Sequence, residues 1–523
     1  AMVAALFAAC GSENQKEDTK KESEKATEGE ANTDPTEPED PDNPWAGIMD
    51  YSDQITITYV AFGDKPNDMD EIQDLINERL VKLINTKIDI QFCSLADWST
   101  KYPLLLQDNT VDLIYAGSWT GYKTNVGKQA FMELDEEFRQ KYLPMSSVNY
   151  TASAWKQVSI NGKCYAVPRN QHDNNNYGAF LIRSDIVEQL GITDKIDSYD
   201  ELKAFVVKAA AEVDHEQGYA YYNFPSLPVQ NPWYQIENHM LTVGNLLWDT
   251  TEPIADDASN LEYAYLTDEF REFAIQMADW ADKGVWPSSA MQESTHTSDR
   301  WSNGQSFIYQ NRFTEADNHI QNVEKLGYPV EYNVVADMDA KVRMTDYSGD
   351  ATAITNFCQN PERAAVVLDI LLNDLEINRL CQGGIEGRHY ILNDDGTRSL
   401  GPESENYGWS GWAWALRNEA IGYPTLALDP RVQAVLEDLN KRVLPEEEWY
   451  FDGFATNDDP IRTQLDLVNA IVNNYQYSFE LGVYGDETEE KLDQFIAELK
   501  EAGIDDIVAE YRKQISEWMA ANK

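Results

Sequence analysis

Aromatic side chains gather in one short stretch of the chain. Tyr407, Trp409, Trp412 and Trp414 fall within eight residues, and glycines lie beside two of the tryptophans. Glycine favours loops because it accepts backbone conformations that other residues avoid. The alternation of Trp412 and Trp414 is typical of a strand and would put both rings on one face. Such rings can stack against the apolar C–H faces of sugars, so the stretch is a candidate carbohydrate contact, although any single ring could instead belong to the core.

Polar candidates follow two predicted strands. Asp64 and Lys65 come directly after the first strand, and Asp173 follows a later one. Carboxylates and ammonium groups can hydrogen-bond the hydroxyls of a sugar whose apolar faces are stacked on aromatic rings. Asp173 precedes three consecutive asparagines, so a solvated loop is the alternative there.

Catalysis is not indicated by the remaining reactive side chains. The chain has 91 Asp and Glu residues, and in so acidic a sequence paired carboxylates do not point to a glycosidase. The histidines lack HExxH or HxH spacing, and no CxxC pair occurs. We therefore predict no catalytic residue, no metal and no cofactor. Cys93 and Cys164 lie in apolar stretches and are expected to be buried thiols, while one disulfide remains possible.

Alternating strands and helices must position these candidates. Residues 55–60 and 88–92 carry alternating β-branched and apolar residues, and 111–115 is a third strand pattern. A helix is predicted from Asp70, with apolar residues at helical spacing up to Leu83. Strands that alternate with helices predict an α/β fold with mainly parallel sheets and helices on both faces.

The carboxyl ends of these strands are the predicted ligand edge. Ligands of parallel α/β sheets bind beyond the carboxyl ends of the strands. Asp64 and Lys65 follow the first strand, and Trp119 and Tyr122 follow the third. We therefore expect these four side chains at one edge of the sheet.

The first residues have the pattern of a bacterial lipoprotein signal. An apolar run ends in Ala8-Ala9-Cys10-Gly11, with Phe7 at the place where leucine is usual. We predict that residues 1–9 are the remainder of a signal peptide and that Cys10 carries a diacylglyceryl anchor. Residues 10–50 would be a disordered acidic tether, because they are rich in charge and proline and poor in apolar side chains. Trp45 is the first residue expected to join a core.

Charge and hydropathy limit the classes of partner that the protein can bind. The formal net charge is -50, whereas proteins bind nucleic acids and anionic membrane surfaces through clustered Lys and Arg. We therefore expect neither a nucleic acid nor an anionic membrane surface as a partner. No apolar run reaches the length of a membrane-spanning helix, so the lipid would be the membrane contact. The folded part, of about 475 residues, is longer than one hydrophobic core usually serves.

A series of motifs resembles the extracellular solute-binding proteins of ABC importers, the maltose-binding-protein-like group. Residues 161–168 (NGKCYAVP) are similar to the family's G-K-x-Y-A-V-P crossover. Further similarities follow in the family's order, at 178–185, 280–286, 301–305 and 360–364. The segments 384–390 and 499–507 resemble a Gram-positive lipoprotein subfamily whose members end in a domain of unknown function. The resemblance covers residues 52–523.

The resemblance implies a two-lobed periplasmic-binding-protein-like fold of type II, with a ligand cleft at the hinge. One lobe would take residues 52–168 plus 312–356, and the other 169–311 plus 357–523. The family places segments that contain Trp119, Tyr122, Trp233 and Trp301 near this cleft.

The function implied by the resemblance is capture of a carbohydrate, expected to be an oligosaccharide, for an ABC permease by hinge closure. The receptor would be a monomer, held by its lipid at the extracellular face of the cytoplasmic membrane. Two alternatives stay open. One is a peptide-binding or signalling receptor of the same fold, and the other is a surface glycosidase.

Overall fold

A computed structural model of the protein describes most of the folded chain. The described residues are 43–171, 179–221, 240–243, 245–292, 297–310, 313–335, 341, 343–344, 346–408, 411–422, 424–445 and 448–522. The predicted lipidation site Cys10 and the candidate ligand residues Asp173, Trp233 and Trp409 lie outside these ranges. Pro44–Lys523 form one compact unit. Trp45 is buried, as predicted, so the folded part begins before residue 50, where we expected the tether to end.

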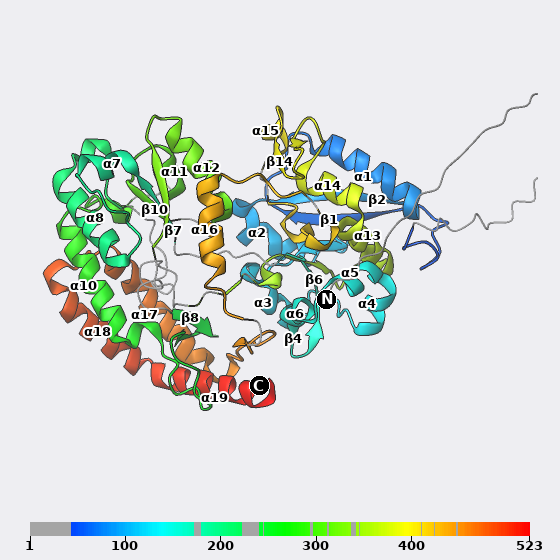
Figure 1. Cartoon of the computed structure of the whole chain (residues 1–523). Coiled ribbons are helices and arrows are strands. Elements are labelled where there is room, and N and C mark those ends of the chain that lie inside the picture. Colours follow the sequence, from blue (N-terminus) through cyan, green and yellow to red (C-terminus); the bar gives the residue numbers. More distant parts are fainter. Residues whose placement is uncertain are drawn as a thin grey trace, which may run out of the picture. The chain divides into compact units, whose positions relative to one another are not determined.

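The first lobe is built on a five-stranded sheet of order β2-β1-β3-β12-β6 (Figure 1). Its strands are β1 (Ile55–Phe62), β2 (Thr86–Cys93), β3 (Leu113–Tyr115), β6 (Val167–Pro168) and β12 (Ala351–Ile354). β1 runs parallel to β2 and β3, whereas β12 is antiparallel to β3 and β6. The three strands predicted from the sequence are therefore confirmed as parallel neighbours.

Helices of the first lobe begin with α1 (Met69–Ile84), which buries Met69, Ile72, Ile76, Leu80 and Ile84. These residues recur every three or four positions and so form one apolar face. The other helices of this lobe are α2 (Leu95–Leu105), α3 (Tyr122–Gly127), α4 (Glu136–Tyr142), α5 (Pro144–Asn149), α6 (Ala152–Gln157), α13 (Pro361–Asn373), α14 (Leu375–Gly383) and α15 (Ser404–Tyr407). Two short hairpins complete it: β4 (Ser159–Ile160) with β5 (Lys163–Cys164), and β13 (Tyr390–Leu392) with β14 (Arg398–Leu400).

The second lobe contains a three-stranded sheet of order β10-β7-β11. β7 (Ala179–Arg183) pairs antiparallel with both β10 (Ile308–Gln310) and β11 (Val330–Val334). β8 (Met240–Val243) and β9 (Leu246–Asp249) form a separate hairpin. Its helices are α7 (Ser184–Gln189), α8 (Tyr199–Glu212), α10 (Asp268–Asp282), α11 (Thr297–Ser302), α12 (Phe313–Glu324), α16 (Pro430–Asn440), α17 (Arg462–Glu480), α18 (Thr488–Glu501) and α19 (Ile504–Asn522).

The fold class is confirmed as α/β, but the sheets are mixed rather than mainly parallel. Strand patterns predict which residues are extended and leave the direction of the partner open. In the second lobe β7 and β11 are joined antiparallel over five residue pairs.

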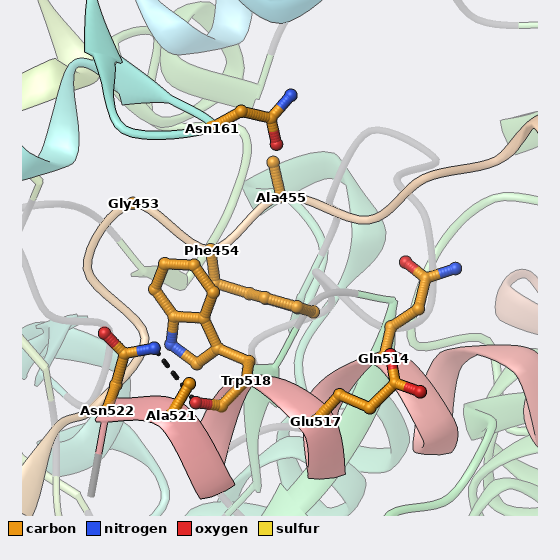
Figure 2. Close-up of a pocket in the computed structure, with 9 residues that line it drawn as sticks. All are labelled: Asn161, Gly453, Phe454, Ala455, Gln514, Glu517, Trp518, Ala521 and Asn522. Atoms are coloured by element: carbon orange, nitrogen blue, oxygen red, sulfur yellow. Dashed lines mark hydrogen bonds between the residues drawn. The ribbon is translucent and has the colours of Figure 1, made fainter.

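A shallow groove lies where α19 meets the chain that precedes α17. Figure 2 shows Phe454 and Trp518 side by side at this groove, whose volume is about 360 Å³. The Trp518 indole N–H donates to the carbonyl oxygen of Tyr450 at 2.6 Å. Trp518 is thus partly buried and anchors the preceding chain to α19.

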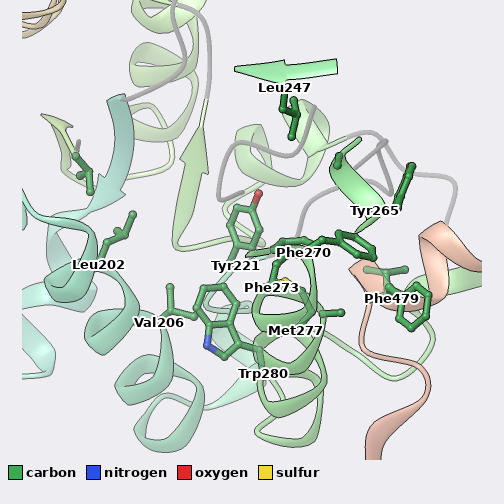
Figure 3. Close-up of a cluster of buried hydrophobic side chains, with 14 of the residues drawn as sticks. Leu202, Val206, Tyr221, Leu247, Tyr265, Phe270, Phe273, Met277, Trp280 and Phe479 are labelled. Carbon is green, nitrogen blue, oxygen red and sulfur yellow. The ribbon is translucent and has the colours of Figure 1, made fainter. Parts of the chain in front are cut away.

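Separate hydrophobic cores mark the lobes. Figure 3 shows the core of the second lobe, where Phe270, Phe273, Met277 and Trp280 project from α10. Trp280 and Trp286 are both buried in this core. A different cluster fills the first lobe and includes residues of β1, β3, α1 and α13.

The cores and strand pairs correct the predicted lobe boundaries. Residues 312–335 were expected in the first lobe, but β11 pairs with β7, and α12 packs with α16 in a cluster of the second lobe. Residues 357–416 were expected in the second lobe, but α13 and α14 pack in the core of the first. The first lobe therefore takes 44–168 and 347–416, and the second takes 179–335 and 430–522.

Other sequence expectations concern single side chains. Ser198 and Glu201 form the capping box of α8 that their spacing indicates. Cys93 and Cys164 are buried free thiols, as predicted, and Cys358 and Cys381 are free too. Across the described ranges, no helix is both long and apolar enough to cross a bilayer.

Candidate functional site

Five aromatic side chains meet at the carboxyl ends of β1 and β3. This strand-end aromatic cluster consists of Phe62, Trp98, Tyr115, Trp119 and Trp414. Phe62 ends β1, and its ring centroid lies 5.2 Å from that of Trp98, 5.4 Å from Tyr115, 5.1 Å from Trp119 and 5.5 Å from Trp414. The cluster therefore lies at the edge where α/β sheets bind ligands.

Trp119 is the exposed member of the cluster. Its side chain is 51% exposed, although it contacts Phe62 edge-on, with an interplanar angle of 87°. A large aromatic ring that is fixed on one edge and open to solvent can take a ligand on its free face. The structure thus leaves one face of Trp119 open, and its contact with a ligand stays a prediction.

A series of buried hydrogen bonds fixes the Trp119 indole. The Trp119 indole N–H donates to the Tyr115 hydroxyl oxygen at 3.1 Å, and that hydroxyl donates to the Asp350 carboxylate. Asp350 in turn pairs with Arg169 at 2.7 Å. Burial, together with the neighbouring Asp350 charge, raises the pKa of Tyr115, so its hydroxyl keeps its proton. This series of hydrogen bonds therefore holds the Trp119 indole in one orientation.

Gly117 makes this arrangement possible. A Cβ atom at residue 117 would lie 2.5 Å from the carbonyl oxygen of Gly349 and 2.9 Å from the Tyr115 hydroxyl. Only glycine allows the turn after β3 to approach the start of β12 so closely.

Asp64 and Lys65 lie on the loop that follows Phe62, and both are exposed. Gly63 N donates to Cys93 O at 2.9 Å, which holds the start of this loop against the end of β2. Lys65 forms an exposed ion pair with Asp70 at 2.6 Å, and such pairs are weak enough to be exchanged for a ligand. The sequence prediction that these two residues share an edge with Trp119 agrees with their positions at the ends of β1 and β3.

Asp68 ties the far end of this loop to the turn that precedes β13. Its Oδ2 accepts hydrogen bonds from Arg388 Nη2 at 2.7 Å and from His389 Nε2 at 3.0 Å. His389 is buried, and its Nδ1 accepts from Ile385 N at 3.0 Å, so Nε2 carries the proton that Asp68 accepts. One carboxylate therefore links the loop after β1 to the turn before β13.

Replacing Asp68 by alanine should lower the free energy of unfolding by about 1–3 kcal/mol, because it leaves the buried His389 N–H without its acceptor. Urea unfolding followed by circular dichroism measures this change. Glu71→Ala is the matched control, since Glu71 pairs with the same Arg388 at 2.8 Å but its side chain is 55% exposed. The control should change the free energy by less than about 1 kcal/mol. Equal losses in both variants would contradict the role given to Asp68.

Three predicted ligand residues lie in hydrophobic cores instead. Tyr122 is 3% exposed, Trp301 0% and Trp412 2%, which leaves no ring face for a ligand in this structure. The Tyr122 hydroxyl donates to Val158 O at 2.6 Å, and the Trp301 indole donates to His319 O at 3.0 Å. Trp412 and Trp414 do not share a strand: Trp414 begins a 3₁₀ helix that ends at Leu416, so the two rings diverge.

Phe62, Trp98 and Tyr115 belong to the cluster but were not singled out in the sequence. Tyr115 ends a strand that the sequence predicts, so its position was an available signal, whereas β1 extends two residues past its predicted end, to Phe62. Trp98 lies in α2, and nothing in its local pattern points toward the cluster. Its partly buried indole N–H finds no acceptor among the residues that the structure describes.

Comparison with known proteins matches both the C-terminal segment and the whole chain. Residues 450–520 match the model of a domain of unknown function (DUF3502). A carbohydrate ABC transporter substrate-binding protein of Streptococcus pneumoniae is 21% identical over 497 residues, which are 91% of this chain and 93% of that protein. The predicted C-terminal domain is therefore confirmed.

Solved structures share the fold. The N-glycan transport solute-binding protein NgtS of Streptococcus pneumoniae superposes with a TM-score of 0.68 at 17% identity, covering 89% of this chain and 99% of that one. An extracellular solute-binding protein of Bifidobacterium longum subsp. infantis gives 0.62 at 13% identity, covering 89% and 98%. The Streptococcus pneumoniae substrate-binding protein FusA in complex with kestose gives 0.60 at 17%, covering 89% and 100%. The resemblance predicted from the motifs is thus confirmed: the chain is a homologue of a carbohydrate ABC transporter substrate-binding protein and has the fold of extracellular solute-binding proteins.

Proposed function

We propose that the protein is an extracellular receptor that binds an oligosaccharide and presents it to an ABC permease. The observation that carries the proposal is Trp119, whose ring is half-exposed yet fixed by Phe62 and Tyr115. Asp64 and Lys65 follow the same strand as Phe62 and are exposed. A fixed indole beside hydrogen-bonding groups suits a sugar, whose C–H faces are apolar and whose rim is hydroxylated.

The ligands of the similar proteins support the choice of ligand class. NgtS has been solved in complex with Man5GlcNAc, and FusA in complex with kestose. Both are neutral oligosaccharides. The high negative charge of this chain, -50 overall, is compatible with uncharged ligands.

Delivery requires that the ligand change the arrangement of the lobes. The chain passes between them three times, after β6, after β11 and after Leu416. Several crossings permit hinge motion without separation. A ligand closes such a receptor only if it binds the closed state better, so residues of both lobes must contact it.

Attachment at the outer face of the membrane is the second part of the proposal. Cys10 would be lipidated, and the acidic segment that follows would keep the lobes within reach of the permease. Metabolic labelling with palmitate should mark the protein, and Cys10→Ser should abolish the label and release the protein from membranes. A labelled Cys10→Ser variant would remove the anchor from the proposal.

Calorimetry and thermal denaturation with a panel of ligands test the ligand class. The panel contains Man5GlcNAc, kestose and short manno-oligosaccharides, with an unbiased peptide mixture as the competing class. A ligand present at 100 times its Kd adds about 2.7 kcal/mol to the free energy of unfolding, so binding is visible as a raised midpoint. A midpoint raised by peptides alone would favour the peptide receptor. Cleavage of any oligosaccharide during incubation would favour the glycosidase.

A further inference from the structure

A cavity of about 460 Å³ lies between the two lobes, apart from the strand-end aromatic cluster. This interlobe cavity is lined by Ser153 and Gln157 of α6, by Arg343 and Met344 of the crossing segment, and by Asn440, Val443, Leu444, Pro445, Trp449 and Asp452 of the second lobe. Its volume is within the range of about 300–1,000 Å³ that is usual for ligand sites. Its lining combines apolar side chains with hydrogen-bonding ones, as in a site for a sugar residue.

One wall of the cavity comes from residues 448–458, which we call the strap. The strap is held by α19 of the second lobe at several points. Trp518 donates to Tyr450 O at 2.6 Å, and Gln514 exchanges two hydrogen bonds with the backbone of Asn457, at 2.7 and 2.9 Å. The strap lies at the start of the matched domain of unknown function, residues 450–520.

The strap also contacts the first lobe. Asp452 accepts hydrogen bonds from Ser153 Oγ at 2.6 Å and from Gln157 Nε2 at 3.1 Å, both on α6. Lys123 of α3 donates to Thr456 O, and burial lowers the pKa of Lys123. The C-terminal domain thus reaches across from the second lobe and bonds to two helices of the first.

Trp449 offers an unused donor at this cavity. Its indole N–H is buried and has no acceptor within the described ranges. The Arg343 guanidinium lies over the indole ring, 3.9 Å from its centroid, and also pairs with Asp452 at 3.2 Å. A buried donor without a partner costs free energy that an incoming acceptor would recover. Arg343 is paired with carboxylates, which favours a neutral acceptor such as a hydroxyl over an anion.

We propose that the strap contributes a glycan subsite: the interlobe cavity binds one neutral sugar residue, whose hydroxyl accepts from the Trp449 indole N–H. This inference rests on the proposed function and extends it. Because the walls come from both lobes, a sugar in the cavity binds the present lobe arrangement and not a separated one. The strap would therefore make closure of the lobes depend on whether the ligand is long enough to reach the cavity.

The test is Trp449→Phe, which keeps an aromatic ring and removes the N–H. Calorimetry with Man5GlcNAc, kestose and the manno-oligosaccharides should show affinity about three- to tenfold lower than in the wild-type protein, as expected for one lost hydrogen bond. Trp286→Phe is the matched control. The Trp286 indole N–H already donates to Leu481 O at 3.2 Å in the core of the second lobe, so its removal should leave affinity unchanged.

A second measurement does not depend on the folding of the variant. In wild-type protein labelled with 5-fluorotryptophan, the resonance assigned to Trp449 should shift when the ligand is added. The subsite would be overturned if the wild-type protein binds a glycan but the affinity of Trp449→Phe is unchanged and the Trp449 resonance does not shift. The proposed function would still stand in that case. Failure of the wild-type protein to bind any glycan of the panel would contradict the proposed function and this inference together.

Discussion

Replacing Asp369 by alanine is expected to lower the free energy of unfolding by about 3–5 kcal/mol, since it leaves several buried donors without an acceptor. Asp369 lies on α13 and is 0% exposed. It accepts from the Trp45 indole at 2.8 Å, from Ser146 N at 2.8 Å, from Met145 N at 3.1 Å and from Asn373 Nδ2 at 3.1 Å. Two of these donors are at the start of α5, where a carboxylate also complements the helix dipole. One side chain thus joins the first folded residues, α5 and α13.

The measurement is equilibrium unfolding in urea, followed by circular dichroism. Asp395→Ala is the matched control, because Asp395 is exposed and its hydrogen bonds from Thr397 lie within its own turn. The control should change the free energy of unfolding by less than about 1 kcal/mol. A loss below about 1 kcal/mol for Asp369→Ala would show that water replaces the carboxylate, and would contradict its role in joining these elements.

Asp369 also shows why part of the fold could not be read from the sequence. Trp45 was predicted to enter a core, because it follows a tract without aromatic residues and without Ile, Leu or Val. Its partner lies 324 residues further along the chain. Local pattern identifies a buried residue, whereas its partner depends on which helices pack together. The same limit explains β11, whose pattern indicates a strand but not its pairing with β7.

The candidate site was predictable where it depends on strand ends. Asp64, Lys65 and Trp119 follow β1 and β3 directly, and the topology alone brings such positions to one edge. Aromatic composition was a poorer guide. Trp301 and Trp412 are fully enclosed, because their rings fill space between helices and strands that only the packed structure defines.

Replacing Trp119 by alanine should weaken oligosaccharide binding by about tenfold or more. The burial of a large aromatic face on a ligand is worth about 1.5–3 kcal/mol, and each 1.4 kcal/mol changes the Kd tenfold. The effect on stability should be small, because the side chain is 51% exposed. Calorimetry measures the affinity, and thermal denaturation without ligand checks the fold.

Two further variants separate stacking from general loss of apolar surface. Trp119→Phe keeps a ring on Phe62 but loses the hydrogen bond to Tyr115, so it should retain part of the affinity. Val148→Ala removes an apolar side chain that is 81% exposed on α5, outside the aromatic cluster, and should bind as the wild-type protein does. If Trp119→Ala binds as tightly as Val148→Ala, the ligand does not stack at the ends of β1 and β3. Binding at the interlobe cavity would remain possible in that case, because its Trp449 wall does not depend on Trp119.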